Sequence, residues 1–374
     1  MIKSVVKKFI PSFLLNWYYG FFPVFGNILY GFPSKKLTVI GVTGTNGKST
    51  VVEFITSIFQ QAGLDVCSIS SIRFQIKNKI WQNKLKMTMP GRTKIHRFLR
   101  KAVRAGCKYA VIEVTSEGIK QYRHLGIDFK TAVLTNLTKE HIESHGSFEN
   151  YKRAKGKLFE KAKHLVVNLE DPNSDYFLSF SGKKHPYTKK EFALNLKGDF
   201  NLYNASAAAE VALIENISLE DIKRGLERVR SIPGRLEKVS NNIYIDYAHT
   251  PDALEKVYQN LEGDLICVLG SCGGGRDKWK RPELGKIASK YCSKIILTNE
   301  DPYDEDPGQI VKEIAQGIDK DYEIIIDRKQ AIKKALQEQG TVIITGKGRE
   351  PWMCVKHGKI PWDDKKIVEQ ELGL

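Results

Sequence analysis

Short runs of apolar, β-branched residues alternate along this chain with longer stretches of helical periodicity. From residue 37 to about residue 232, the apolar runs are Leu37–Ile40, Tyr109–Val114, Thr131–Thr135 and His164–Val167. Such an alternation is typical of a mostly parallel sheet that is covered by helices. The loops that carry chemistry are then expected at the carboxyl ends of these strands.

A break at Ser231-Ile232-Pro233-Gly234 ends the first alternation. The strands predicted after it are Ile243–Ile245, Leu265–Leu269, Lys294–Leu297, Glu323–Ile326 and Thr341–Ile344. With 374 residues, of which 41% are hydrophobic, the chain can form two α/β domains with cores of their own. We expect a first domain over residues 37–232 and a second, Rossmann-like domain over residues 233–374.

The first 36 residues differ in composition from the rest of the chain. No charged residue lies between Lys8 and Lys35, aromatic residues are frequent, and Lys3 and Lys7 precede the segment. The segment is long enough to span a bilayer, but proline, glycine and asparagine are expected to interrupt a helix there, at Pro11, Asn16, Gly20, Pro23, Gly26 and Asn27. We favour an anchor that lies on the inner face of the cytoplasmic membrane, with a true span and a segment packed on the globular body as alternatives.

The net charge indicates which kinds of partner the protein binds, and the cysteine pattern indicates its redox compartment. The net charge of +16 favours polyanions, and the sequence carries no nucleic-acid-binding motif, so we expect phosphorylated or carboxylate substrates and an anionic membrane surface rather than nucleic acid. Six scattered cysteines without a C-x-x-C pair indicate reduced thiols in a cytoplasmic protein. Cys272 is interpreted as a small residue in a tight turn rather than as a nucleophile.

A glycine-rich segment follows the first apolar run directly. It reads Gly41-Val42-Thr43-Gly44-Thr45-Asn46-Gly47-Lys48-Ser49-Thr50. Glycines let the backbone wrap an anion, and Lys48 and Ser49 stand where a phosphate and its Mg²⁺ need them. We therefore expect a P-loop ATPase-type domain that binds ATP through Gly44, Thr45, Asn46, Gly47, Lys48, Ser49 and Thr50. A motor-type or GTPase protein is disfavoured because the loop spacing differs and no N-K-x-D motif follows.

The form T-G-T-N-G-K-S resembles the ATP loop of the Mur ligases and of folylpolyglutamate synthetase. The resemblance to the Mur ligases continues in order over about residues 37–362. The matching segments are M-T-M-P at 87–90, E-V-T-S-E at 113–117, T-N-L-T-K-E-H-I-E-S-H-G at 135–146, Y-K-R-A-K-G-K-L-F at 151–159, G-D-F-N-L-Y-N at 198–204, P-G-R-L-E at 233–237, D-Y-A-H-T-P-D-A-L at 246–254, G-G-G-R-D-K-W-K-R-P at 273–282 and G-K-G-R-E at 346–350. On these motifs the chain is identified as a member of the Mur ligase family, most similar to the type that adds the third amino acid to the peptidoglycan stem.

The resemblance implies an ATP-dependent ligase that joins a precursor carboxylate to an amino acid through an acyl phosphate. It implies that Glu113 and His141 ligate one Mg²⁺ and that Ser49 or Thr50 holds the ion on ATP. It further implies that a carbamylated Lys155 holds a second Mg²⁺, although a solvated helix lysine is the alternative. Lys48, Lys155, Glu113 and His141 are thus the expected catalytic residues. For His145 two interpretations stay open: a group that supports the metal ligands without binding the ion, or a simple surface residue.

By the same resemblance, further residues contact the nucleotide and the substrates. Asn201 and Asn204 match positions that contact the adenine, Arg235 a phosphate, and Asp246 or His249 the ribose, with the second domain closing over the nucleotide. The expected substrate-binding residues are Thr115, Ser116, Arg123, Glu300, Asp301, Tyr303, Gly346 and Glu350. The family's D-N-P-R motif is E-D-P-Y here, so the arginine for a second acceptor carboxylate is absent and the acceptor amino acid stays open. Tyr303 is alternatively a packed loop aromatic.

One departure concerns the donor. Family members carry a separate domain before the ATP loop that binds the UDP-sugar, whereas about 36 apolar residues precede the loop here. We expect a donor that resembles UDP-MurNAc-L-Ala-D-Glu, in a UDP-linked or a lipid-linked form. A folylpolyglutamate-type ligase and a membrane-tethered ATP-binding homologue without ligase activity are the alternative functions.

Overall fold

A computed structural model of the chain describes residues 12–85, 87–91 and 93–374, with the side chains of residues 12–17 excepted. Its contacts divide the chain into two compact units. Unit 1 comprises Met1–Leu137, Glu149–Ala193 and Leu202–Arg228, and unit 2 comprises Thr138–Phe148, Leu194–Asn201 and Val229–Leu374. Within the described ranges, no helix is long and apolar enough to cross a membrane.

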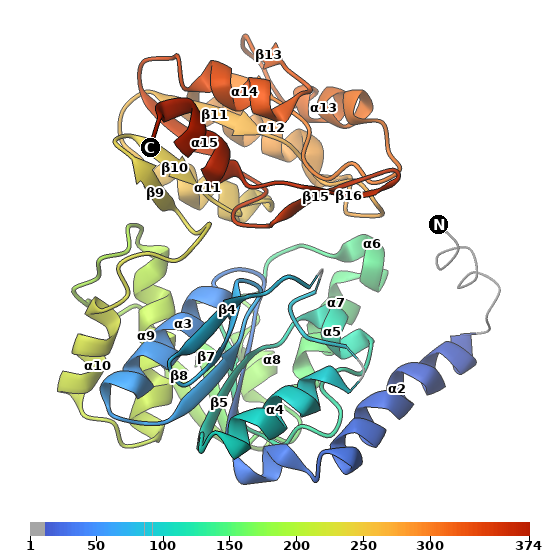
Figure 1. The fold of residues 1–374 in the computed structure, drawn as a ribbon, viewed down its shortest axis with the longest axis vertical. Coiled ribbons are helices and arrows are strands. Elements are labelled where there is room, and N and C mark those ends of the chain that lie inside the picture. Colours follow the sequence, from blue (N-terminus) through green and yellow to red (C-terminus); the bar gives the residue numbers. More distant parts are fainter. Residues whose placement is uncertain (1–11, 86, 92) are drawn as a thin grey trace. The chain divides into compact units, whose positions relative to one another are not determined.

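Unit 1 is built on an eight-stranded sheet of order β4-β3-β2-β5-β1-β6-β7-β8 (Figure 1). All neighbours pair in parallel except β2–β3 and β3–β4, which are antiparallel. The strands are β1 (Thr38–Thr43), β2 (Val66–Ile69), β3 (Arg73–Ile76), β4 (Lys79–Gln82), β5 (Tyr109–Glu113), β6 (Phe129–Leu134), β7 (His164–Asn168) and β8 (Lys183–Tyr187). Strand β1 lies between β5 and β6, so the loop after β1 begins at the middle of the sheet.

The helices of unit 1 lie around this sheet (Figure 1). They are α2 (Ser12–Leu29), α3 (Lys48–Gln61), α4 (Lys94–Arg104), α5 (Ser116–Lys120), α7 (Phe148–Gly156), α8 (Ser174–Leu178), α9 (Phe200–Ile214) and α10 (Leu219–Glu227), with the 3-10 turn η1 (Pro33–Lys36). Helix α3 packs closely on α10, because a Cβ at Gly225 would lie 2.5 Å from Ile58 Cα. Ser57 Oγ donates to Gly225 O at 2.7 Å in the same contact.

The structure corrects the expectation that Asn16, Gly20, Pro23, Gly26 and Asn27 interrupt the N-terminal segment. Helix α2 runs without a break from Ser12 to Leu29. Pro23 and Gly26 are buried against the body, so packing outweighs their low helix propensity. Lys3, Lys7, Lys8 and Pro11 lie outside the described residues.

Unit 2 holds a six-stranded sheet of order β13-β12-β11-β14-β10-β9, parallel except for β9. Its strands are β9 (Glu237–Ser240), β10 (Ile243–Ile245), β11 (Leu265–Leu269), β12 (Cys292–Leu297), β13 (Glu323–Ile324) and β14 (Thr341–Ile344), and β15 (Trp352–Val355) and β16 (Gly358–Pro361) form a separate hairpin. The helices are α6 (Ile142–His145), α11 (Pro251–Gln259), α12 (Lys280–Tyr291), α13 (Pro307–Ala315), α14 (Arg328–Ala335) and α15 (Asp364–Leu372).

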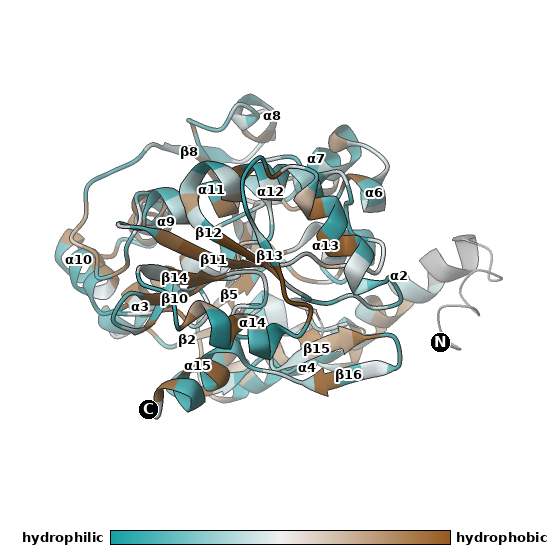
Figure 2. Ribbon diagram, turned by 90° about the horizontal axis from the view of Figure 1, so that it is seen from above, coloured by the Kyte–Doolittle hydropathy of each residue, from teal (hydrophilic) through white to brown (hydrophobic). Residues whose placement is uncertain are grey.

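The sheet of unit 2 is apolar on both faces, as expected for parallel strands between helices. One cluster joins β11 and β12 to α11, α12 and α13, and a second joins the same strands to α14 and α15. Figure 2 shows the apolar β11 and β12 in brown among these helices. The predicted fold class, two α/β regions with mostly parallel sheets, is therefore confirmed.

The strand predictions agree with the structure in position more than in length. Leu265–Leu269 and Thr341–Ile344 are strands with the expected bounds, whereas Glu323–Ile326 shortens to Glu323–Ile324. The first strand is Thr38–Thr43 rather than Leu37–Ile40 and continues through Gly41. A Cβ at Gly41 would lie 2.7 Å from Leu158 and 2.8 Å from Phe129, so this tightly packed glycine belongs to the core of the sheet.

Candidate active site

The glycine-rich loop joins β1 to α3 in the expected way. Thr45 N donates to Asn136 O and Asn46 N to Asn136 Oδ1, both at 2.9 Å, and Thr135 Oγ1 donates to Asn46 O at 2.6 Å. The residues that follow β6 thus fix the shape of the loop. Lys48, the first residue of α3, donates from Nζ to Thr45 O at 2.8 Å, which places its charge across the loop.

Two glycines of this loop have no substitute. Gly44 (φ +149°) and Gly47 (φ +83°) adopt backbone angles that favour glycine. A Cβ at Gly44 would overlap Thr135 Oγ1, and a Cβ at Gly47 would overlap Asn204 Oδ1. The second contact places Asn204, on α9, beside the start of α3, although 157 positions separate the two residues in the numbering.

Ser49 and Glu113 meet at the carboxyl end of β5. Ser49 Oγ donates to Glu113 Oε2 at 2.9 Å, and Ser71 N donates to the same oxygen at 2.8 Å. Both side chains are buried, Ser49 at 3% and Glu113 at 3% exposure. A buried carboxylate needs such partners, since burying an unpaired charge is costly. The sequence predicts Glu113 at a strand end, and the structure adds that its Oε2 atom faces Ser49.

These donors fit a Mg²⁺ ion. Hydroxyl and carboxylate oxygens are ligands that Mg²⁺ prefers, and neighbouring ligands on an octahedral ion at 2.0–2.1 Å lie about 2.9 Å apart. The distance between Ser49 Oγ and Glu113 Oε2 is 2.9 Å. Among the described residues, no group of three or more His, Cys, Asp or Glu side chains is suited to a metal ion. A Mg²⁺ ion here would therefore need further oxygen ligands from water or from the nucleotide.

Lys155 reaches the same loop from α7. Its Nζ donates to Gly44 O at 2.7 Å and lies 4.6 Å from the centre of the Tyr151 ring, and the side chain is only 1% exposed. Burial, reinforced by the nearby charge of Lys48, lowers the pKa of Lys155 well below its ordinary value, against the opposing effect of Glu113. The structure thus rejects the alternative of a solvated helix lysine.

The remaining predicted residues of unit 1 have structural contacts of their own. Thr115 caps α5 by accepting from Gly118 N at 3.1 Å, and Ser116 beside it is buried. Arg123 Nη1 donates to Met89 O at 3.1 Å, which ties it to the segment M-T-M-P. Unit 1 therefore brings Lys48, Ser49, Glu113, Lys155 and Asn204 to one loop, while Thr115 serves as a cap.

In unit 2, the segment that carries His141 is tied to residues 276–280. Asp277 accepts from Ile142 N at 3.2 Å and from Glu143 N at 2.9 Å, and Lys280 Nζ lies 2.9 Å from Glu140 Oε1 in a buried ion pair. His141 itself precedes α6 in a left-handed conformation, with φ +58°. The segment that carries His141 and the segment that carries Lys280 are therefore held together by these contacts.

Arg235, Asp246 and His249 gather around Tyr247. Asp246 is buried and accepts from Leu236 N and Ala248 N at 2.5 and 2.6 Å, while the Arg235 guanidinium stacks 4.6 Å from the centre of the Tyr247 ring. Burial raises the pKa of Asp246, although Arg235 opposes it. Burial and the cations Lys280 and Arg276 lower the pKa of His249 well below its usual range, so its imidazole is neutral.

The predicted acceptor residues surround a lysine that sequence reasoning passed over. Lys347 Nζ lies 2.8 Å from Asp301 Oδ1 and 2.6 Å from Glu350 Oε2, and is 0% exposed as a residue. Burial alone would lower the pKa of Lys347, but Glu350 and Asp301 raise it above its usual value. The sequence offers one indication of this lysine. It stands between two glycines in the G-K-G-R-E motif, shortly after the buried strand β14.

Glu300 points one carboxylate oxygen at Cys272 and the other at Gly346. Cys272 Sγ donates to Glu300 Oε1 at 2.8 Å, and a Cβ at Gly346 (φ +101°) would overlap Glu300 Oε2. Burial and the neighbouring Glu300 and Asp301 carboxylates raise the pKa of the Cys272 thiol well above its ordinary value, which argues against a nucleophile. Tyr303 packs on Gly274 and donates from its backbone N to Cys354 O at 3.1 Å.

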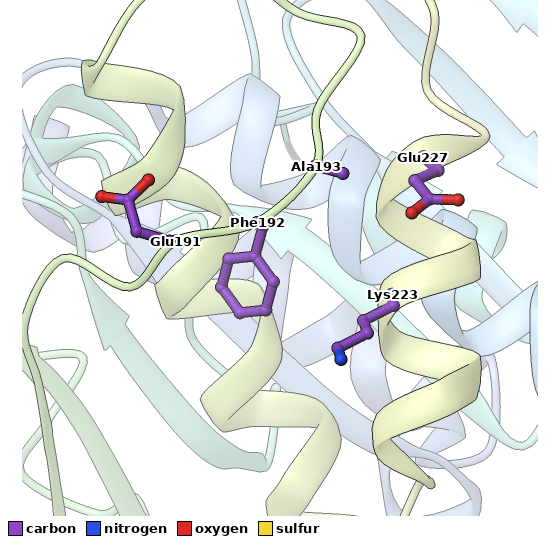
Figure 3. Close-up of a pocket in the computed structure, with 5 residues that line it drawn as sticks. All are labelled: Glu191, Phe192, Ala193, Lys223 and Glu227. Atoms are coloured by element: carbon purple, nitrogen blue, oxygen red, sulfur yellow. The ribbon is translucent and has the colours of Figure 1, made fainter.

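The hollow drawn in Figure 3 lies elsewhere in unit 1. Glu191, Phe192, Ala193, Lys223 and Glu227 line it, from the segment before α9 and from α10. None of the predicted site residues is among them. Its two carboxylates and one lysine are ordinary surface groups, so the candidate active-site residues are those of the loop and of the two clusters in unit 2.

Comparisons with known proteins agree with this geometry. The Mur ligase middle domain matches residues 42–189, and the Mur ligase glutamate ligase domain matches residues 234–348. A Clostridium botulinum protein named UDP-N-acetylmuramoyl-L-alanyl-D-glutamate--2,6-diaminopimelate ligase is 34% identical over 91% of this chain and 79% of its own length.

Two solved structures extend the comparison. A structure of UDP-N-acetylmuramoyl-L-alanyl-D-glutamate--2,6-diaminopimelate ligase has a TM-score of 0.59 at 28% identity and covers 90% of this chain and 78% of that one. A Mycobacterium tuberculosis folylpolyglutamate synthase has a TM-score of 0.71 at 16% identity, covers 86% of this chain and 91% of that one, and shares the fold alone.

The fold, the phosphate loop and the matched domains define an ATP-dependent ligase that forms amide bonds. The two domain matches together cover most of the chain between its phosphate loop and Gly348. The chain belongs to the Mur ligase family, as the motifs in its sequence predicted.

Proposed function

We propose that this protein joins an amino acid to the carboxylate end of a peptidoglycan precursor that resembles UDP-MurNAc-L-Ala-D-Glu. The observation that carries the proposal is the convergence of Lys48, Ser49, Glu113 and Lys155 around one loop at the centre of a mostly parallel sheet. ATP supplies the driving force: its γ-phosphoryl group passes to the precursor carboxylate, the amine attacks the acyl phosphate, and phosphate leaves.

The residues of unit 1 perform the positioning and charge neutralisation that this reaction needs. The amides of the glycine-rich loop and the start of α3 hold the phosphates, and Lys48 adds a positive charge beside them. Ser49 and Glu113 hold Mg²⁺, which neutralises charge on the phosphoryl oxygens. In unit 2, we assign His141 to a Mg²⁺ ion, and Arg235, Asp246 and His249 to the nucleotide; Asn201 and Asn204 contact the adenine.

Lys155 is proposed to be carbamylated and to hold a second Mg²⁺. A neutral amine adds CO₂ and releases a proton, which gives an anionic carbamate from a group that as an ammonium cannot bind a cation. The burial of Lys155 and the lowered pKa of its amine favour this chemistry, because they populate the neutral form. Its contact with Gly44 O places the modified group beside the phosphate loop.

The acceptor amino acid is proposed to bind in unit 2, where Lys347, Asp301 and Glu350 form an ion-paired cluster. Gly346 and Glu350 then take its ammonium group, and Glu300 and Tyr303 face the rest of the side chain. Tyr303 cannot pair with a second carboxylate as an arginine does, so an acceptor with one carboxylate is the preferred assignment. The relatives' names specify 2,6-diaminopimelate, which makes it the reference acceptor in any test.

The experiment is phosphate release from ATP and Mg²⁺ with UDP-MurNAc-L-Ala-D-Glu and a panel of diaminopimelate, lysine, ornithine and other amino acids. Release that depends on one acceptor, is lost in Lys48→Ala and Lys155→Ala, and persists in the exposed control Lys157→Ala is the expected result. Tyr303→Arg should raise the use of diaminopimelate relative to acceptors with one carboxylate. No release with any acceptor contradicts the UDP-linked donor and directs the same panel to a lipid-linked precursor.

Two alternatives remain testable in the same assay. A folylpolyglutamate-type ligase would release phosphate from ATP only when a folate and glutamate are both present. The fold shared with folylpolyglutamate synthase is the reason to include this test. A homologue that binds ATP without ligating requires ATP binding with no turnover on any substrate. We also propose a peripheral association of the enzyme with an anionic membrane, which rests on separate residues.

A further inference from the structure

Helix α2 presents an exposed apolar face on the surface of unit 1. Counting about 100° per residue, its outward side chains span roughly 140° of the helix. They are Phe21, Val24, Phe25, Ile28 and Leu29, and Ile28 and Leu29 are 59% and 57% exposed. We call these five residues the apolar stripe. A contiguous group of large exposed apolar side chains on one helix face marks an interaction surface rather than random exposure.

The opposite face of α2 is seated on the protein, which fixes the direction of the stripe. A Cβ at Gly26 would lie 2.9 Å from Thr93 Cα, and a Cβ at Gly126 would lie 2.8 Å from Asn27 Cβ. Pro23 is buried on this inner face. Glycine at both contacts lets the helix approach the body so closely that α2 lies along the surface, with its stripe turned away from it.

The end of α2 is also fixed. Gly31 (φ +68°) donates to Ile28 O at 2.9 Å, and Phe32 N donates to Asn27 O at 2.8 Å, the pair of bonds that defines a Schellman motif. Ser34 Oγ then donates to Gly126 O at 3.2 Å and accepts from Asp128 N at the same distance. The stripe is therefore a presented surface of the folded unit.

Positive charge lies on the segment that follows α2 and on the neighbouring helix α4. Helix α2 contains no charged residue, and Lys35 and Lys36 follow it and are exposed. Helix α4 contacts α2 (Figure 1). Its sequence contains no acidic residue. On one of its faces Lys94, Arg97, Lys101 and Arg104 recur three and four positions apart, and all four are exposed. No ion pair to a described carboxylate is formed by these four side chains.

We propose that the apolar stripe of α2 and the basic face of α4 dock unit 1 on the surface of an anionic lipid bilayer. Apolar and aromatic side chains bounded by lysine and arginine are the composition of helices that lie in the membrane interface, where apolar burial and attraction to acidic headgroups add together. The lack of acidic residues on both helices favours an anionic partner surface. The surface does not involve the phosphate loop, so the inference is independent of the ligase reaction.

The test is co-sedimentation of the full chain with phosphatidylcholine vesicles and with vesicles that contain phosphatidylglycerol. Binding to the anionic vesicles that weakens with added NaCl is expected, with little binding to the neutral ones. Phe25→Glu/Ile28→Glu should lower the affinity at least about tenfold, since each apolar side chain is removed from the lipid. The matched control is Leu213→Glu/Leu219→Glu, which places the same charges at exposed leucines of α9 and α10 and should bind as the parent does.

Charge reversal tests the second element separately. Lys94→Glu, Arg97→Glu and Lys101→Glu should each weaken binding to anionic vesicles roughly fivefold, and most strongly at low salt. Circular dichroism and phosphate release, recorded for every variant, report folding and ligation independently of docking. A parent chain that stays in the supernatant with anionic vesicles at low salt overturns the proposal, as does binding that the stripe variants leave unchanged. A stripe-dependent dimer without vesicle binding overturns it in favour of a second copy of the chain.

Discussion

Lys155 Nζ lies 2.7 Å from the carbonyl oxygen of Gly44, so that an amine from α7 ends on the backbone of the phosphate loop. The two residues are 111 positions apart in the chain. The contact buries the amine beside Lys48, another cation, and thereby lowers its pKa. An amine so placed is suited to covalent modification rather than to a surface ion pair.

The titration of Lys155 should appear in the pH dependence of stability. Because its folded pKa is lowered from 10.5, the unfolded chain binds more protons than the folded protein between the two pKa values. The free energy of unfolding from this group therefore rises with pH in that window, by up to roughly 1.4 kcal/mol per pH unit, and falls as the pH falls. In CO₂-free buffer, urea unfolding of Lys155→Met at pH 6, 7.5 and 9 should show a flatter slope than the parent. Lys157→Met, at an exposed position, should keep the parental slope; equal slopes for all three proteins would contradict the lowered pKa.

Gly44→Ala should strongly weaken nucleotide binding while the protein still folds. The new Cβ overlaps Thr135 Oγ1, so the loop must move by an amount that costs about 3 kcal/mol, which corresponds to roughly a hundredfold loss of affinity for an ATP analogue in calorimetry. Gly63→Ala is the matched control, because Gly63 also has a positive φ but no atom within 4 Å of an added Cβ. It should lower the melting temperature and leave the affinity unchanged. An undiminished affinity in Gly44→Ala would show that the loop does not hold the phosphates.

Ser49→Ala tests the proposed metal ligand. Loss of the hydroxyl that lies 2.9 Å from Glu113 Oε2 should lower kcat/KM for ATP by about a hundredfold and raise the Mg²⁺ concentration needed for half-maximal rate. Ser57→Ala, in the same helix, removes the hydrogen bond to Gly225 O instead. That control should cost about 1 kcal/mol of stability and leave kcat/KM unaltered. A normal Mg²⁺ requirement in Ser49→Ala would exclude this serine as a ligand.

Removal of one partner from the buried Arg328–Asp364 ion pair of unit 2 should be strongly destabilising. Arg328 donates to both carboxylate oxygens of Asp364 at 2.9 and 2.8 Å, and both side chains are 0% exposed. Asp364→Asn leaves the guanidinium buried without its counter-charge and should destabilise the protein by 3–5 kcal/mol, as an order of magnitude. Glu220→Gln, which breaks the exposed pair with Arg224, should change the free energy of unfolding by less than about 1 kcal/mol. Thermal unfolding of the two variants decides the comparison.

Apolar runs predicted most of the interior strands of both sheets, but β2 and the polar strands toward the two rims of the unit 1 sheet escaped prediction. Strands β3, β4 and β8 read R-F-Q-I, K-I-W-Q and K-K-H-P-Y, and their sequences carry no continuous apolar run. They are strands because a neighbouring strand supplies hydrogen-bond partners, which is a tertiary effect. Helix α2 was misjudged for a similar reason, since close packing on Thr93 and Gly126 compensates for its proline and glycines.

The candidate site likewise contains contacts that depend on tertiary structure and that the sequence alone does not predict. The motifs predict Lys48 at a helix start, Glu113 at a strand end and Lys155 in a helix, and the structure has them there. Each stands in a segment with a recognisable pattern. The predicted site residues do not include Ser71, which donates to Glu113, or Tyr151, whose ring faces Lys155. They also do not include Lys347, which pairs with Asp301 and Glu350 in unit 2. Ser71 meets Glu113 only when β2 pairs with β5, and no local pattern of the sequence encodes that pairing.

The position of β1 between β5 and β6 has a consequence for the order of events during synthesis. The loop after β1 leaves the ribosome early, yet the groups that hold it belong to Thr135 and Asn136. A nascent chain that ends before these residues lacks the partners that shape the loop, and pairing across such a separation in sequence is slow. Capture of ATP by stalled chains of increasing length would therefore begin only after β6 has emerged, which makes nucleotide binding a reporter of co-translational folding.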